Sequence, residues 1–309
     1  MMYLSIFKHI LKAEKERQNI MIQIVKNLNN IVNEETTLIK ENKGVPYITF
    51  NKLNDIEWLT NAFSTRIGGV SEGIYSSMNL SFTLNDDSEK VLDNFKIFAN
   101  AIGVDVKDMV YSQQTHTINV KKITKDNKGM GIIRERDYKD IDGIITNEPG
   151  ICLVTSYADC VPLYFVDIKN KAIGLSHSGW RGTVGNIAAN TLQLMKKEYG
   201  TKEEDVIAVI GPSICKDCYE VSKDLYDEFE KKYSQDELRD IFERKNDEKY
   251  QLDLWKANYY NFVNLGIKKE NISVTDICTC CNKEIMFSHR GSHGKRGTLC
   301  AFLMIKENK

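Results

Sequence analysis

The stretch ICLVTSYADCVPLYFVDIKNKAIGLSHSGWRG, residues 151–182, decides the fold of this chain. It contains three runs rich in Val, Ile, Leu and aromatic residues, at 151–156, 162–167 and 171–176, and polar turns separate them. Short apolar runs bounded by turn residues are typical of buried strands. We therefore predict three strands here, followed by a helix over about 183–199.

Strands and helices alternate on both sides of this stretch. The same periodicity arguments predict further strands at 47–50, 58–65, 109–113, 118–123, 206–210, 272–276 and 299–305, and helices at 89–101, 222–233 and 252–265. The charged segment that runs to Lys249 reads as a solvated face. No repeat, heptad run or low-complexity tract occurs, so we expect mixed sheets covered by helices.

Residues 1–43 differ from the rest of the chain. Four apolar residues between positions 4 and 11 fall on one helical stripe, and a charge-rich segment follows them. We predict a helical extension over 1–43 and a single domain over 44–309, because no Pro-, Gly- or Ser-rich linker divides the remainder. The extension could bind a partner or a membrane surface, pack on its own domain, or precede an internal start at Met21.

Composition and charge favour small-molecule chemistry. The chain has 309 residues and a formal net charge of -1, so it has no bulk attraction for nucleic acid or anionic membranes. No apolar stretch approaches the roughly twenty residues of a membrane span. Several of the eight cysteines, such as Cys152 and Cys300, lie in apolar runs that suit reduced thiols. We expect a cytoplasmic protein without a disulfide framework, and infer no obligate protein partner.

Three residues at the ends of apolar runs could bind one metal ion. They are His116 in YSQQTH, Cys160 in ADCVP and His177 in LSHSGWRG. Imidazole nitrogen and thiolate sulfur are donors that zinc prefers, and catalytic zinc usually has three protein ligands. Each residue alone could equally be a buried structural side chain. Because two of only five histidines lie in such turns, we predict an open zinc site.

Two arginines beside glycine turns are candidates for binding an anion. Arg181 lies between two glycines just after the strand that ends at His177, and Thr183 could cap the helix that follows. Free amides at a helix N-terminus and a guanidinium group suit phosphate or carboxylate. Arg66 has a similar place in STRIGGVS, residues 64–71. Arg181 could instead form a surface ion pair, and Gly-Gly alone is weak evidence for a site.

The sequence leaves the role of two aspartates undecided. Asp142 in DIDGIITN looks like an ordinary turn residue, and Asp159 directly precedes Cys160. A carboxylate near zinc could orient a ligand imidazole or move a proton.

Five further cysteines fall into two groups. Cys215 and Cys218 are separated by two residues, and Cys278, Cys280 and Cys281 follow later. Two close cysteine pairs could build a tetrahedral structural zinc site. The adjacent Cys280 and Cys281 fit poorly with the usual two-residue gap, which favours a set of reduced thiols instead.

Seven motifs in order resemble those of the laccase-domain family, also called the peptidoglycan editing factor or polyphenol oxidase family. They are STRxGGVS from Ser64, QTH from Gln114, DGIIT from Asp142, ADCVP from Ala158, HSGWRG from His177, GPSI from Gly211 and FSHR from Phe287. The resemblance runs from about residue 46 to the C-terminus. Family members often read FFSYR at the last motif, so His289 could contact substrate or merely replace an aromatic residue.

The resemblance implies a compact α+β fold in which packed mixed β-sheets are flanked by helices. The family holds its metal by the His, Cys and His that correspond to His116, Cys160 and His177. It also implies a purine nucleoside phosphorylase that acts on adenosine, inosine, guanosine and methylthioadenosine, with adenosine deaminase activity. Purine nucleosides and phosphate would be the ligands, with Arg66 and Arg181 as candidates for holding the phosphate. Zinc can lower the pKa of a bound water to about 7, which suits the deamination.

Other functions could use the same residues. Cys160 could be the nucleophile of a thiol hydrolase that cleaves an amide in a cell-wall precursor, with His177 or His116 as its base. A thiolate bound to zinc would not be free for that role. A multi-copper oxidase would need more imidazoles than this chain offers, and a purely structural zinc usually has four protein ligands.

Overall fold

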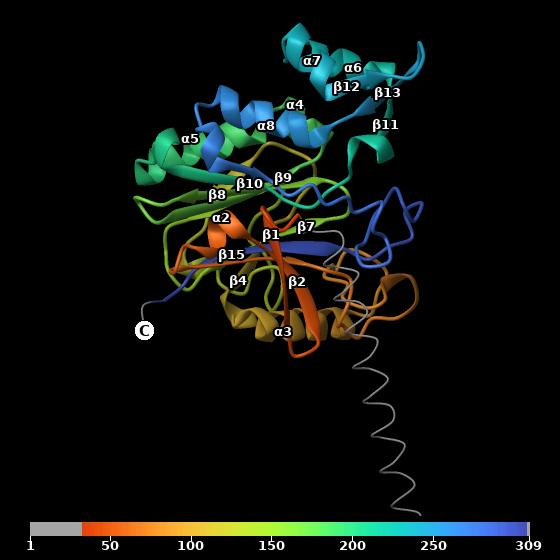
Figure 1. The fold of residues 1–309 in the computed structure, drawn as a ribbon. Coiled ribbons are helices and arrows are strands. Elements are labelled where there is room, and N and C mark those ends of the chain that lie inside the picture. The colour runs from red at the N-terminus through yellow and green to blue at the C-terminus, as the bar shows by residue number, and fades with distance from the viewer. Residues whose placement is uncertain (1–32, 308–309) are drawn as a thin grey trace, which may run out of the picture.

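Two six-stranded sheets pack face to face in the computed structural model, which describes residues 33–307 (Figure 1). The first sheet has the order β1 (Thr37–Asn42), β2 (Val45–Phe50), β3 (Leu59–Ser64), β15 (Leu299–Ile305), β7 (Cys152–Tyr157) and β4 (Met109–Tyr111). The second has the order β14 (Ile272–Val274), β10 (Val206–Ile210), β8 (Val161–Asp167), β9 (Ala172–Ser178), β6 (Gly143–Thr146) and β5 (Val120–Lys122). Both sheets mix parallel and antiparallel pairs, as predicted.

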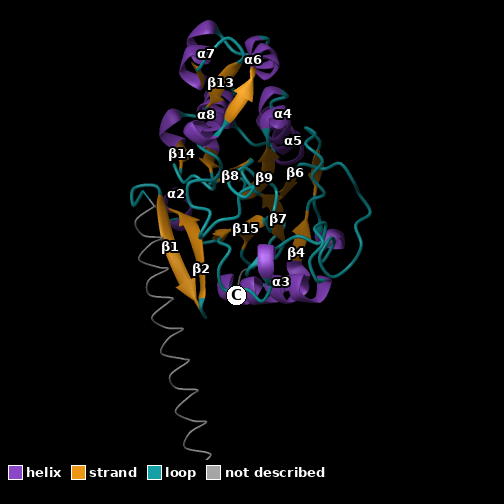
Figure 2. Cartoon of the chain, turned by 90° about the vertical axis from the view of Figure 1, so that its right-hand side faces the viewer, coloured by secondary structure: helices purple, strands orange, loops and turns teal. Residues whose placement is uncertain are grey.

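Helices cover the outer faces of both sheets (Figures 1 and 2). Helix α3 (Ser88–Ile102) lies on the first sheet, where Phe98 stacks on Phe302 of β15 with ring centroids 4.6 Å apart. Helices α5 (Ile187–Tyr199) and α8 (Leu254–Asn264) lie on the second sheet. The structure is therefore an α+β domain of packed mixed sheets flanked by helices, which confirms the expected fold class.

Strand β15 shows why the sequence of the sheets is so apolar. Alternate residues point to opposite faces of a strand. Leu299, Ala301 and Leu303 pack between the two sheets, whereas Cys300 and Phe302 pack against α3. Because both faces of the central strands are buried, their sequences are nearly continuous apolar runs.

A small sheet extends beyond the second sheet, between β10 and α8 in the chain (Figure 2). It has the order β11 (Glu220–Ser222), β13 (Lys249–Leu252) and β12 (Phe242–Arg244), and helices α6 (Lys223–Glu230) and α7 (Gln235–Ile241) accompany it. The prediction of a merely solvated face before Lys249 was therefore wrong. Helix α7 buries only Leu238 and Ile241, so its charged majority concealed it.

The N-terminal boundary also differs from the prediction. Residues 37–42, expected within a helical extension, form β1 and pair antiparallel with β2. Lys43 and Gly44 connect the two strands with φ angles of 55° and 80°, and two positive φ angles suit a tight hairpin turn. The helix expected over residues 1–32 lies outside the described residues.

Two local predictions around the site need correction. The helix expected over 183–199 is two helices, α4 (Trp180–Val184) and α5, and Thr183 lies inside α4 rather than capping the longer helix. Asn186 caps α5 in a left-handed conformation. The DG turn at 142–143 begins strand β6.

Among residues 33–307, no helix is both long and apolar enough to cross a bilayer.

Replacing Tyr164 by Phe should weaken the junction between the two large sheets. The buried Tyr164 hydroxyl donates to the Ala62 carbonyl of β3 at 3.0 Å, and a buried hydrogen bond contributes about 1 kcal/mol. We expect Tyr164→Phe to lower the free energy of unfolding by about 1 kcal/mol in urea denaturation. In the matched control, Tyr260→Phe, the lost bond to Asp240 is exposed, so the change should be much smaller. Equal losses would contradict this assignment.

Candidate metal centre

His116, Cys160 and His177 come together, as the sequence predicted. Their donor atoms all lie within 4.8 Å of one another, and Cys160 Sγ lies 3.9 Å from His116 Nε2. His177 belongs to the end of β9, Cys160 directly precedes β8, and His116 lies in the loop after β4. His177 is buried, Cys160 is half-buried and His116 is exposed. The cluster is thus anchored in the sheet on one side and open on the other.

Asp142 holds two of these residues in place. Its fully buried carboxylate accepts a hydrogen bond from His177 Nδ1 at 2.8 Å and from the His116 amide at 3.1 Å. It also accepts the amides of Thr115 and Thr117 at 3.0 and 2.9 Å. Because Nδ1 of His177 is engaged, Nε2 is the atom available for a ligand. Of the two roles open to Asp142, orientation of an imidazole is the one that the geometry supports.

A side chain at Gly179 would crowd the cluster. A Cβ atom there would lie 3.1 Å from both Cys160 Sγ and His116 Cδ2. The chain after β9 therefore passes directly against the cluster, which explains the glycine in HSGWRG.

The ionisable groups of the site shift one another's pKa values. Burial raises the pKa of the Cys160 thiol, but the charge of His177 and hydrogen bonds from His116 and His177 outweigh it and bring the pKa to about 6. Burial lowers the pKa of His177, but Cys160 and Asp142 outweigh it and bring that pKa to about 9. Burial opposes ionisation of Asp142, yet His177 and the loop amides lower its pKa overall. Without a metal, the site therefore holds a thiolate and an imidazolium near neutral pH.

The cluster lines a cavity of about 530 Å³ that it shares with three arginines. Arg181 places its guanidinium 4.2 Å from the centroid of the Trp180 ring. Arg290 donates to the carbonyls of Cys218 and Glu220. A hollow of about 790 Å³ along residues 131–139 contains none of the three candidate ligands.

The third arginine, Arg296, donates to the Gly297 carbonyl and the Thr298 hydroxyl. Burial lowers its pKa, whereas Asp159 raises it. The guanidinium groups of Arg290 and Arg296 donate only to neutral oxygen atoms. Asp159 is the acidic residue of the lining, so the cavity has an excess of positive charge.

The structure does not bring Arg66 to this cavity. Its guanidinium donates to the carbonyls of Ser76 and Lys283 and lies 4.6 Å from the centroid of the Phe287 ring. Arg66 therefore ties three segments of chain together. The geometry favours Arg181, which does line the cavity, as the anion-binding residue of the predicted pair.

The remaining sequence candidates have clear positions. Asp159 accepts the Thr279 hydroxyl and the Arg290 amide, both at 2.7 Å, so it fixes the C-terminal loop beside the cavity. His289 lines the cavity. Arg290 and Arg296 were missed, although the basic composition of residues 289–296, HRGSHGKR, was a usable signal.

The site combines an open cluster of two imidazoles and a thiolate with a positively charged cavity. Such a site suits an enzyme that binds small anions or uses phosphate. A family model described as multi-copper polyphenol oxidoreductase laccase matches residues 60–306. The chain belongs to this family, which confirms the resemblance found in its motifs.

Individual relatives agree with this assignment. The chain is 34% identical over 249 residues to purine nucleoside phosphorylase YlmD of Bacillus subtilis, covering 79% of this chain and 88% of that protein. It is 35% identical over 232 residues to adenosine deaminase RL5 of an unknown prokaryotic organism, covering 74% and 87%. The crystal structure of hypothetical protein YfiH of Bacillus licheniformis superposes with a TM-score of 0.82 at 31% identity, covering 87% and 99%.

In the metal-free protein, Cys160 should react more readily than the fully buried thiol of Cys152. Its pKa of about 6 means that it becomes a thiolate as the pH rises through about 6. We expect its alkylation by iodoacetamide, mapped by peptide mass spectrometry, to rise with a midpoint near pH 6. Cys152 is the internal control, because burial raises its pKa and it should stay unmodified. A midpoint above pH 8 for Cys160 would contradict the charge pairing.

Removing the charge of Asp142 should weaken metal binding. In Asp142→Asn, an amide group replaces the carboxylate that accepts these hydrogen bonds. Loss of a hydrogen bond to a metal-binding histidine typically reduces metal affinity about 10- to 100-fold. We expect the zinc concentration that half-protects Cys160 from iodoacetamide to rise by that factor. Asp140→Asn is the matched control, because Asp140 contacts the Thr115 side chain only at the surface. Equal protection in both variants would remove Asp142 from this role.

Proposed function

We propose that this protein is a zinc-dependent purine nucleoside phosphorylase that cleaves adenosine, inosine, guanosine and methylthioadenosine with phosphate and also deaminates adenosine. The observation that carries the proposal is the single cavity in which the His116, Cys160 and His177 cluster shares the walls with three arginines. One relative is named a purine nucleoside phosphorylase and another an adenosine deaminase, and these names support both reactions. The cytoplasm, where eight free thiols stay reduced, is the compartment that suits this role.

The donor set fits zinc. Two imidazoles and one thiolate are ligands that zinc prefers, and three ligands leave a fourth position for water or substrate. A bound zinc ion would act there as a Lewis acid and lower the pKa of water. Among residues 33–307, the side-chain clusters that could bind a metal together contain two histidines. That number does not provide for several copper ions, so we do not extend the copper chemistry of the family description to this chain.

The arginines supply the second requirement of phosphorolysis. Phosphate must be held near C1' of the ribose while the ribosyl group becomes cationic. Guanidinium groups bind phosphate through paired, charge-assisted hydrogen bonds. The guanidinium of Arg181 lies over the Trp180 ring, and those of Arg290 and Arg296 donate to neutral acceptors, so none of these contacts neutralises their positive charge. We therefore assign phosphate binding to these three residues, in place of Arg66.

A second candidate function is supported by the charge pattern of the metal-free site. Cys160, His177 and Asp142 form a series in which a thiolate faces an imidazolium that a carboxylate orients. Such a series is the arrangement of a cysteine-type amide hydrolase. An enzyme of that kind would edit cell-wall peptide precursors without a metal. A chelator should abolish phosphorolysis by the zinc enzyme and leave amide hydrolysis by the thiol enzyme intact.

The first test is phosphate-dependent release of hypoxanthine from inosine by purified protein, with its zinc content measured on the same sample. We expect release that requires phosphate and is lost in Cys160→Ala together with the zinc of this centre. Release that persists in zinc-free protein, or no release from zinc-loaded protein, would contradict the proposal. The second result would favour amide hydrolysis.

Arg181→Ala should impair the use of phosphate and leave the zinc in place. A hydrogen bond to a charged group contributes about 1.5–3 kcal/mol, so kcat/KM for phosphate should fall at least about tenfold. Arg66→Ala is the comparison, because its guanidinium is committed to the carbonyls of Ser76 and Lys283. We expect Arg66→Ala to reduce stability and leave the KM for phosphate nearly unchanged. Full activity of Arg181→Ala would refute its assignment.

A further inference from the structure

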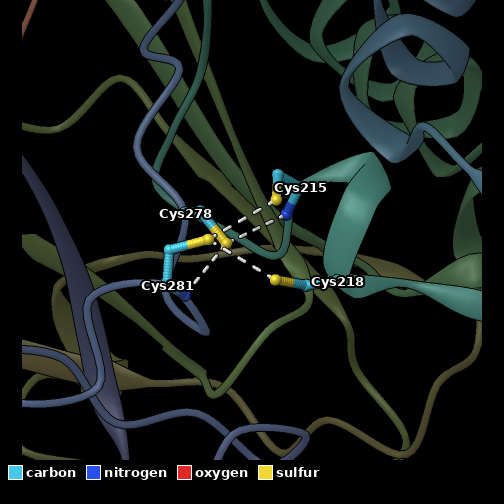
Figure 3. A group of neighbouring side chains, drawn as sticks. All are labelled: Cys215, Cys218, Cys278 and Cys281. Atoms are coloured by element: carbon cyan, nitrogen blue, oxygen red, sulfur yellow. Dashed lines mark hydrogen bonds between the residues drawn. The ribbon is translucent and has the colours of Figure 1, made fainter.

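Four cysteines that are distinct from the candidate metal ligands lie close together (Figure 3). Cys215, Cys218, Cys278 and Cys281 place all four Sγ atoms within 4.8 Å of one another, and we call them the four-cysteine cluster. Cys215 directly precedes the short helix η5 (Lys216–Cys218), which Cys218 ends, and both follow β10. Cys278 and Cys281 lie in the segment after β14. The cluster thus joins two segments that are far apart in the sequence.

The distances within the cluster suit a tetrahedral metal site. A Zn–S bond of about 2.3 Å places tetrahedral sulfur atoms about 3.8 Å apart. Cys281 Sγ lies 3.4 Å from Cys218 Sγ and 3.9 Å from Cys215 Sγ. These separations are far longer than a disulfide bond of about 2.05 Å, and all four residues are free thiols.

Hydrogen-bond donors and a positive charge lie beside the cluster. The backbone amides of Cys215 and Cys281 both donate to Cys278 Sγ at 3.3 Å. Such amides stabilise negative charge on sulfur. Arg290 donates to the Cys218 carbonyl at 3.3 Å and brings a positive charge beside the group. Four thiolates around a divalent ion carry net negative charge, which this arginine helps to offset.

The spacing in the sequence is also that of a zinc site. Cys215 and Cys218 are separated by two residues, and so are Cys278 and Cys281. The adjacent Cys280 stands outside the cluster. The interpretation as reduced thiols paired Cys280 with Cys281 and so overlooked the second two-residue gap. Two such pairs are the usual ligand pattern of a structural zinc ion.

We propose that the four-cysteine cluster binds a structural zinc ion. Four protein ligands leave no open position, so this ion would cross-link the chain and take no part in catalysis. Tyr219, which follows Cys218, lines the cavity of the candidate metal centre, as does Arg290. The ion would therefore fix one wall of that cavity, and would tie the small sheet to the C-terminal loop.

Metal content of the full-length chain, purified under reducing conditions, tests this proposal. We expect two zinc ions per chain in the unaltered protein. Cys218→Ser/Cys281→Ser and Cys160→Ala should each retain one, and the combination should retain none. Cys280→Ser is the matched control and should retain two. X-ray absorption of the Cys160→Ala protein should show four sulfur ligands at about 2.3 Å.

Several results would overturn the proposal. One zinc ion in the unaltered protein that disappears in Cys160→Ala would leave none for the cluster. Loss of the second ion in Cys280→Ser would show a different ligand set, iron in place of zinc would show a different metal, and disulfide bonds in the intact mass would show a redox pair. Should the double variant fail to fold, release of one zinc from Cys160→Ala by a thiol-specific mercurial supports the site, and no release overturns it.

Discussion

The candidate metal centre depends on the buried carboxylate of Asp142. A buried charge is stable only when hydrogen bonds and opposite charge surround it. Asp142 receives the imidazole of His177 from one strand of the second sheet and the backbone amides around His116 from a distant loop. The same bonds satisfy the carboxylate, fix the direction of the His177 imidazole and hold the backbone of the His116 loop. One set of contacts therefore both satisfies the buried charge and positions the two histidine-bearing segments.

The two large sheets provide the rigid support for this centre. Their central strands are buried on both faces, between the sheets and beneath helices, so the ends of β8 and β9 have little freedom. Cys160 directly precedes β8 and His177 lies near the end of β9, where these neighbouring strands pair Val161 with Ser178. Side chains held by such a scaffold are positioned well for metal binding. The exposed loop of His116 supplies the open side.

Arginine placement shows how position decides the role of a residue type. Arg66 and Arg181 have similar sequence surroundings, yet one fixes three segments of backbone and the other lines the cavity. Arg290 links the cavity to the four-cysteine cluster, since its guanidinium reaches the Cys218 carbonyl while the residue lines the cavity. A structural ion at the cluster would then stabilise a wall of the same cavity that holds the candidate metal centre.

The sequence by itself determined most of the strands of the two large sheets, the long helices and the three candidate ligands. Continuous apolar runs, helical periodicity and the chemistry of His and Cys are local properties of the chain. Strand β1, helix α7 and the role of Asp142 emerged only from the tertiary structure. So did the separation of Arg66 from Arg181 and the gathering of the four cysteines. Each of these depends on contacts between distant segments, and the distances and burial that give a side chain its role are set by packing.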